Sequence, residues 1–183
     1  MTALFDPGDR GATLSDDGRY RYDLWRRWDD GPLMGWVMLN PSIGDAETDD
    51  HTIRKCVGFA RLAGAAGISI RNLFAYRTPK PNELRAADRA GVDVVGPANS
   101  SWLARMADDP FTYRPVVAAW GSGPPGRWPL MAARVDVALA VFGRRLQRLD
   151  ARHLSVLAPH PARLGFDTKL VPLPEELYAH RRT

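Results

Sequence analysis

The chain has 183 residues, 45% of them hydrophobic and 25% charged, and a formal net charge of +4. This length and composition are typical of one compact domain, so we expect a single domain over residues 1–183 and no extensive disorder. No apolar run of about 18 residues is present to span a bilayer, and the first residues do not resemble a signal peptide, so we expect a cytoplasmic protein without a membrane partner.

The first elements expected along the chain are a hairpin and a buried strand. The turn sequence at residues 16–18 and the alternation of apolar with polar residues at 20–24 predict a hairpin over residues 12–28. We expect this hairpin to form an accessory edge or flap. The apolar run 34–39 then predicts a strand, which ends abruptly at the polar loop 40–45.

A helix is expected over residues 51–63. Asp49 or Asp50 is well placed to cap it, because carboxylates accept hydrogen bonds from the free backbone amides of a helix N-terminus. Cys56 falls on the apolar face of this helix and is expected to be a buried core thiol. As the single cysteine, it excludes an internal disulfide and a multi-cysteine zinc site. A strand over residues 68–74 follows.

The second half of the chain predicts helices that alternate with two more strands. These strands are expected at the apolar runs 116–120 and 154–157, and the first is uninterrupted by charge, as in a central parallel strand. The helices are expected at residues 82–87, 97–106, 128–149 and 174–180. The whole pattern predicts a three-layer α/β/α sandwich with a mainly parallel central sheet of about four strands, plus the N-terminal hairpin.

Polar segments follow the predicted strands. Asn40 follows the strand at 34–39, and His160 follows the last predicted strand. In open α/β folds, ligands bind outside the carboxyl ends of the strands. Asn40 can orient a water or a carbonyl, and His160 can donate a hydrogen bond to an anion that develops during a reaction. We therefore expect these loops to form two walls of one active site.

Other motifs leave some alternatives open. Residues 121–126 match G-x-G-x-x-G, but two prolines remove amides that a phosphate cradle needs, so dinucleotide binding is not favoured. No G-x-S-x-G elbow presents a serine for acyl transfer. Two explanations stay open for the acidic residues Asp45, Glu47, Asp49 and Asp50. They bind a divalent cation, or they belong to a solvated loop that caps the following helix. We assign no metal ligand and expect no cofactor.

Four short motifs together resemble a known family. They are MLNPS at 38–42, DDHTIR at 49–54, NLFAYR at 72–77 and AWG at 119–121. Over residues 19–161 they resemble a bacterial and phage family known as a domain of unknown function. More distantly, their order is similar to that of the motifs in the uracil-DNA glycosylase superfamily. In that superfamily an Asp-Pro or Asn-Pro loop after the first strand positions a water, and an Asn on the second strand reads the base. A third strand ends in Leu-Trp-Gly, and a final loop carries His-Pro-Ser. The resemblance implies the α/β/α sandwich expected above.

The resemblance also implies catalytic roles. Cleavage of an N-glycosidic bond builds positive charge on the sugar and negative charge on the departing base. Asn40 matches the residue that positions the water, and His160 matches the donor to the base. Asp50 is the third catalytic candidate. Ala162 stands where the superfamily has serine and Asn40 where the most active uracil enzymes have aspartate, which weighs against uracil as the substrate.

The expected binding residues follow from the same comparison. Asn72 matches the residue that reads the base edge, and Phe74 or Tyr76 would stack on the extruded ring. Contacts to DNA phosphates are expected from Ser42, Arg54, Arg77, Gly121 and Arg163.

We therefore expect a DNA glycosylase, a hydrolase that excises a nonstandard or modified base after base flipping, as in DNA repair. DNA is the expected partner, a role with which the positive net charge is compatible, and a monomer is favoured. Two alternatives stay open: a hydrolase or transferase acting on a free modified nucleotide, and a catalytically degenerate nucleic-acid-binding module.

Overall fold

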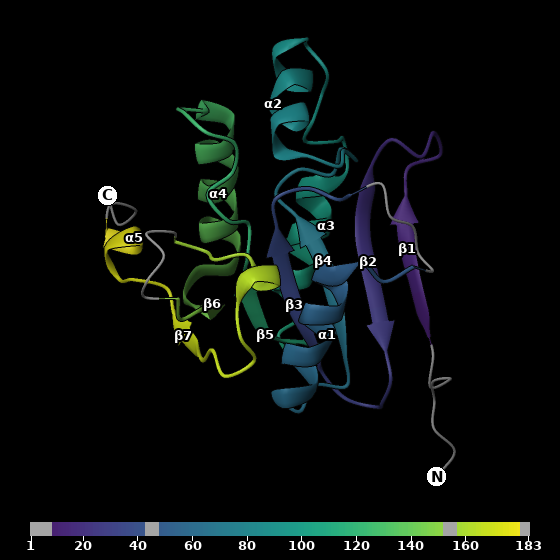
Figure 1. Cartoon of the computed structure of the whole chain (residues 1–183), viewed down its shortest axis with the longest axis vertical. Helices are drawn as coiled ribbons and strands as arrows, with labels where there is room; N and C mark the ends of the chain where they lie inside the picture. The colour runs from purple at the N-terminus through teal and green to yellow at the C-terminus, as the bar shows by residue number, and fades with distance from the viewer. Residues whose placement is uncertain (1–8, 43–47, 152–156, 180–183) are drawn as a thin grey trace.

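A computed structural model of the protein describes residues 9–42, 48–151 and 157–179 (Figure 1). These residues form a seven-stranded mixed sheet in the order β1-β2-β4-β3-β5-β6-β7. The strands are β1 (Arg10–Leu14), β2 (Arg21–Arg27), β3 (Leu33–Met38), β4 (Gly67–Asn72), β5 (Tyr113–Ala118), β6 (Leu146–Leu149) and β7 (Leu170–Pro172). The helices are α1 (His51–Leu62), α2 (Pro81–Arg89), α3 (Asn99–Asp108), α4 (Pro129–Phe142) and α5 (Glu176–Ala179), with short 3₁₀ turns η1 (Gly143–Arg145) and η2 (Pro161–Arg163).

The centre of the sheet is parallel, and both of its edges are antiparallel. Strands β4, β3, β5 and β6 run parallel to one another. On one side β2 pairs antiparallel with β4 and carries β1, and on the other β7 pairs antiparallel with β6. Three of the four expected strands, at β3, β4 and β5, are confirmed as parallel neighbours, whereas the fourth parallel strand, β6, was not predicted, and the sheet is larger and more mixed than expected. The hairpin forms one edge of this sheet, as one of the two expected alternatives has it, and is not a flap, because β2 is buried against β4.

Two apolar cores lie on the two faces of the sheet. Trp36 and Met38 of β3 pack into the core beneath α1, whereas Val37 and the following Leu39 pack into the core beneath α2, α3 and α4. Successive side chains of a strand point to opposite faces, so a strand covered on both sides is apolar throughout. Figure 1 shows α1 in front of the sheet and α3 behind it. In the part of the chain that the structure describes, no helix is long and apolar enough to cross a membrane.

One predicted helix is wrong in its second half. The helix expected over residues 128–149 ends at Phe142, and residues 146–149 form β6, which pairs with β5. Gly143 ends the helix by adopting a φ of 55°, a left-handed conformation that favours glycine. Residues 154–156 of the strand expected at 154–157 lie outside the described residues. The fourth parallel strand is therefore formed by residues that the sequence pattern assigned to a helix.

Candidate functional site

A cavity of about 650 Å³ lies at the carboxyl ends of β3, β4 and β5. This volume is typical of sites for small molecules and cofactors. Its lining comes from the loop after β3, the end of β4, the loop after β5, the N-terminus of α1 and the segment around η2. The parallel strands bring these segments together because their carboxyl ends meet at one edge of the sheet.

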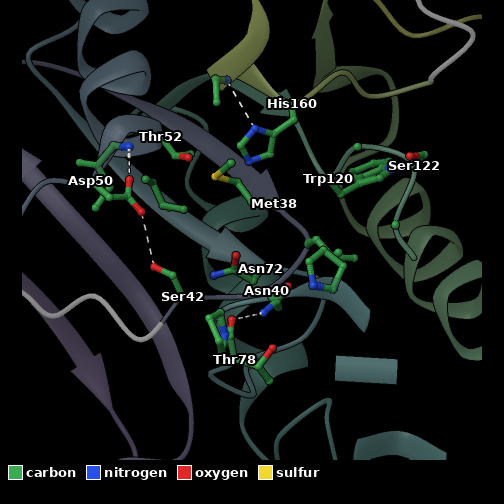
Figure 2. A pocket seen from close by; sticks show the side chains of 18 of the residues that line it. Met38, Asn40, Ser42, Asp50, Thr52, Asn72, Thr78, Trp120, Ser122 and His160 are labelled. Carbon is green, nitrogen blue, oxygen red and sulfur yellow. Dashed lines mark hydrogen bonds between the residues drawn. The ribbon is translucent and has the colours of Figure 1, made fainter. Parts of the chain in front are cut away.

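The cavity gathers most of the site residues expected from the sequence. Those that line it are Asn40, Ser42, Asp50, Asn72, Gly121, His160 and Arg163. In Figure 2, Asp50 lies at the left, His160 to its right, and Asn40 and Asn72 below them. Side chains from the connection between β3 and α1, the end of β4 and the segment around η2 therefore share one site.

The other four expected residues do not line the cavity. Phe74 is fully buried and stacks on Trp128, with ring centroids 4.8 Å apart. Tyr76 packs edge-on against Tyr20. Arg54 is exposed and donates to the backbone oxygen of Asp49, and Arg77 donates to the backbone oxygen of Gly18 at 2.9 Å. Neither ring is thus placed beside a ligand in the cavity.

The side-chain amide of Asn40 is fixed by two backbone carbonyls. Its Nδ2 donates to the oxygen of Thr78 at 3.0 Å and to that of Pro41 at 3.2 Å. Both partners can only accept hydrogen bonds, so the nitrogen must be the atom that faces them. The amide oxygen Oδ1 is then the atom of this side chain that can accept a hydrogen bond from a water.

Asp50 caps α1 and lines the cavity. Its Oδ1 accepts from the backbone nitrogen of Ile53 at 2.8 Å, and its Oδ2 accepts from Ser42 Oγ at 3.5 Å. Of the two capping candidates Asp50 is therefore the cap, whereas Asp49 forms an ion pair with Arg26 at 2.8 Å. The cap directs a carboxylate into the cavity from the positive end of the helix.

The sequence leaves a divalent cation open as a ligand of the acidic loop, and the structure tests this in the described part of the chain. There, no group of three or more His, Cys, Asp or Glu side chains is arranged to hold a metal ion. Asp45 and Glu47, the other two carboxylates of that loop, lie outside the described residues.

Asn72 ends β4 and is 1% exposed. Its side-chain nitrogen Nδ2 is buried and has no hydrogen-bond partner among the described residues. A buried donor without a partner costs free energy, on the order of 1–3 kcal/mol. A ligand acceptor placed in the cavity can satisfy this donor.

The segment that carries His160 is joined to the rest of the site at several points. The backbone nitrogen of Gly121 donates to the oxygen of Ala158 at 2.7 Å, which joins this segment to the loop after β5. On the other side, Lys55 of α1 donates to the oxygen of Leu164 at 2.7 Å. These contacts hold His160 between the loop after β5 and α1.

The partly buried position of His160 favours the neutral form of its ring. Burial lowers its pKa, and this effect exceeds the opposite influence of the Asp50 carboxylate. Its Nδ1 accepts from the backbone nitrogen of Ala162 at 3.4 Å. In a neutral ring the other nitrogen, Nε2, must then carry the proton.

The cavity also contains residues that the sequence analysis did not assign to a site. Trp120 and Thr78 line it from the loops after β5 and β4, and Arg21 reaches it from β2. Burial lowers the pKa of Arg21 to about 10, so its guanidinium remains charged at neutral pH. Trp120 belongs to the AWG motif at 119–121, which was a sequence signal that this residue lies in the site. No sequence signal separated Arg21 from the other arginines.

The chain was compared with protein families, curated proteins and solved structures. No curated protein and no solved structure matches it. One family model, described as "Protein of unknown function (DUF1643)", matches residues 21–158. The matched span contains Asn40, Asp50 and Asn72, and it ends two residues before His160. Because the match covers well over half of the chain, the protein belongs to the DUF1643 family.

Proposed function

We propose that this protein is a DNA glycosylase-like hydrolase that excises a nonstandard or modified base from DNA. One observation carries the proposal: a carboxylate, Asp50, and a neutral imidazole, His160, line different sides of one cavity that also holds Asn40 and Asn72. The order of these residues along the chain, which resembles that of the uracil-DNA glycosylase superfamily, is in keeping with it.

The carboxylate and the imidazole donor in the cavity suit the cleavage of an N-glycosidic bond. When this bond breaks, positive charge develops on the sugar and negative charge on the base. The carboxylate of Asp50 stabilises the sugar cation, and the Nε2–H of His160 donates to the base anion. By analogy with loss of one oxyanion donor, the His160 hydrogen bond contributes roughly 3–4 kcal/mol to the transition state.

The remaining steps are assigned to the two asparagines. Asn40 Oδ1 orients a water toward the sugar carbon. As the water oxygen bonds to that carbon, the electron pair of the broken bond leaves with the base, and the proton lost by the water balances the proton gained by the base. Asn72 Nδ2 donates to an acceptor on the base edge, which supplies the partner that this buried nitrogen lacks among the described residues.

The size of the cavity is in keeping with a single extruded nucleotide. A base within a duplex cannot reach a site at the end of a sheet, so such enzymes flip it into a pocket. Arg163 is exposed and also lines the cavity. We assign to its guanidinium the contact with a phosphate next to the flipped nucleotide.

The proposal is tested by mass spectrometry of bases released from DNAs that contain deaminated, oxidised, alkylated or phage-type hypermodified bases. The wild type is expected to release one of these bases, and Asn40→Ala and His160→Ala to abolish the release. Arg89→Ala is the matched control, because Arg89 is an exposed arginine at the C-terminal end of α2, does not line the cavity and has no assigned contact to DNA; its activity is expected to stay near that of the wild type.

The same panel distinguishes the alternatives. Release from free modified nucleotides but not from DNA would replace the proposal with a nucleotide hydrolase. Salt-sensitive DNA binding without release of any base, with or without magnesium, would replace it with a binding module.

A further inference from the structure

We propose that Asn99 and Arg134 are positioning residues that hold Asn72 in the orientation needed to contact the ligand. We call these two residues the β4 clamp. The proposal rests on the proposed function in one respect, which is that Asn72 is the residue that contacts the base. The clamp itself concerns only the order of Asn72, and that order can be measured without any substrate.

The β4 clamp binds the backbone at the end of β4. Asn99, the first residue of α3, donates through Nδ2 to the backbone oxygen of Asn72 at 3.1 Å and to that of Leu73 at 2.9 Å. Arg134 of α4 donates through Nε to the same oxygen of Leu73 at 2.8 Å. Two helices therefore fix the peptide units on the carboxyl side of Asn72.

The clamp residues are joined to each other through Ser100. Arg134 donates through Nη1 to Ser100 Oγ at 3.1 Å, and Ser100 follows Asn99 in α3. The arrangement ties α4 to the first turn of α3, as well as to the strand. A shift of either helix would therefore be transmitted to Asn72.

The clamp buries a charged side chain that is only partly hydrogen-bonded. Arg134 is only 6% exposed, and burial lowers the pKa of its guanidinium. Its Nη2 and the Oδ1 of Asn99 are buried without a hydrogen-bond partner among the described residues. Burial of a charge that is not fully paired and hydrogen-bonded costs free energy. A cation kept at this cost points to a role in the site.

Asn72 depends on this backbone because its own side-chain nitrogen is not held. Nδ2 has no partner among the described residues, so the direction of the side chain follows from the backbone that the clamp fixes. A small misplacement of a residue that contacts a ligand lowers kcat/KM by roughly 10- to 100-fold. Loss of the clamp is expected to raise KM and weaken discrimination between bases more than it lowers kcat, since Asn40 and His160 stay in place.

The test uses NMR of the side-chain amide of Asn72, assigned with Asn72→Asp. In Asn99→Ala and Arg134→Met we expect these signals to shift and broaden, and in Arg134→Lys, which keeps a donor, to return partly toward the wild type. Arg145→Met is the matched control, because Arg145 also binds backbone oxygens, those of Ala107 and Tyr113, but does not line the cavity. Its Asn72 signals are expected to match those of the wild type.

Unchanged Asn72 signals in folded Asn99→Ala and Arg134→Met would overturn the clamp, as would an equal change in Arg145→Met. If Arg134→Met does not fold, Asn99→Ala decides the question. Base release is measured on the same proteins. If the wild type releases no base, the proposed function fails, while the NMR result still decides whether the clamp orders Asn72.

Discussion

Asn40 and Thr78 join two loops of the site, since the side-chain nitrogen of Asn40 donates to the backbone oxygen of Thr78 at 3.0 Å. The loop after β3 is thereby connected to the loop after β4, 38 residues later in the chain. This connection fixes which atom of Asn40 can face a water. It also makes the amide at position 40 a structural requirement, as well as a candidate catalytic one.

Asn40→Asp is expected to destabilise the protein more than Asn40→Ala. The carboxylate cannot donate, so it places an anion beside the carbonyl oxygens of Thr78 and Pro41, whereas alanine only removes the hydrogen bonds. We expect Asn40→Asp to lower the free energy of unfolding by about 1–3 kcal/mol. Urea denaturation at pH 7 measures it, and an aspartate variant as stable as the wild type would contradict the assigned orientation of Asn40.

His160 is expected to titrate below pH 6.5. Burial is the main cause, and the charges of Arg163 and His51 act in the same direction, against Asp50. Because the pKa in the folded state is lower than in the unfolded chain, His160 contributes stability above pH 6.5 that is lost as the pH falls through the folded pKa.

An NMR titration of the His160 ring checks this expectation, with exposed His51 as the internal comparison. If neutral His160 donates to the base, activity should persist below pH 6.5 and fall only as the ring becomes protonated. A midpoint above 6.5 would mean that the Asp50 carboxylate outweighs burial.

Asp50→Asn and Asp50→Ala separate the two roles of this residue. Asparagine keeps the side-chain oxygen that caps α1, so stability should stay near that of the wild type, while alanine should cost about 1 kcal/mol. Both variants remove the charge in the cavity, and both should lower base release on the order of 100-fold. Thermal unfolding and base release measured together check this, and full activity in Asp50→Asn would exclude a role for the carboxylate.

The buried ion pair of Asp23 and Arg71 is expected to be a strong structural contact. Arg71 Nη2 lies 3.3 Å from Asp23 Oδ2, and Ser69 Oγ donates to Asp23 Oδ1 at 2.7 Å. Both charged side chains are buried, so Asp23→Ala leaves a buried cation without its partner and should cost about 3–5 kcal/mol. Glu175→Ala, which breaks an exposed pair with Arg144, should cost less than about 1 kcal/mol. Urea denaturation of both variants checks the contrast.

The elements that the sequence predicted well carry strong local signals. The apolar run at β3 marks a strand covered on both faces, and Asp50 stands directly before an amphipathic helix, where a cap belongs. The C-terminal half of the helix expected at 128–149 shows the opposite case. The sequence of β6 is also compatible with a helix, and only its pairing with β5, more than 25 residues earlier, makes it a strand.

Side-chain direction was less predictable than position. Asn72 and Phe74 were both expected to contact a base, and they are two residues apart. Asn72 lines the cavity, whereas Phe74 packs inside the core against Trp128. The chain leaves the strand between them, so the alternation that holds within β4 no longer predicts where a side chain points.

The sequence by itself determined which loops hold polar side chains at the ends of apolar strands, because that pattern depends on neighbouring residues along the chain. It thereby placed Asn40 and His160 in the candidate site, whereas Asn72 was assigned from the family resemblance and Asp50 was a further candidate at the start of a helix. The tertiary structure decided that these four share one cavity and that Arg21 and Trp120 join them. Those outcomes depend on contacts between distant residues, such as Gly121 with Ala158 and Asn99 with Asn72, whose formation only the packing of the whole chain determines.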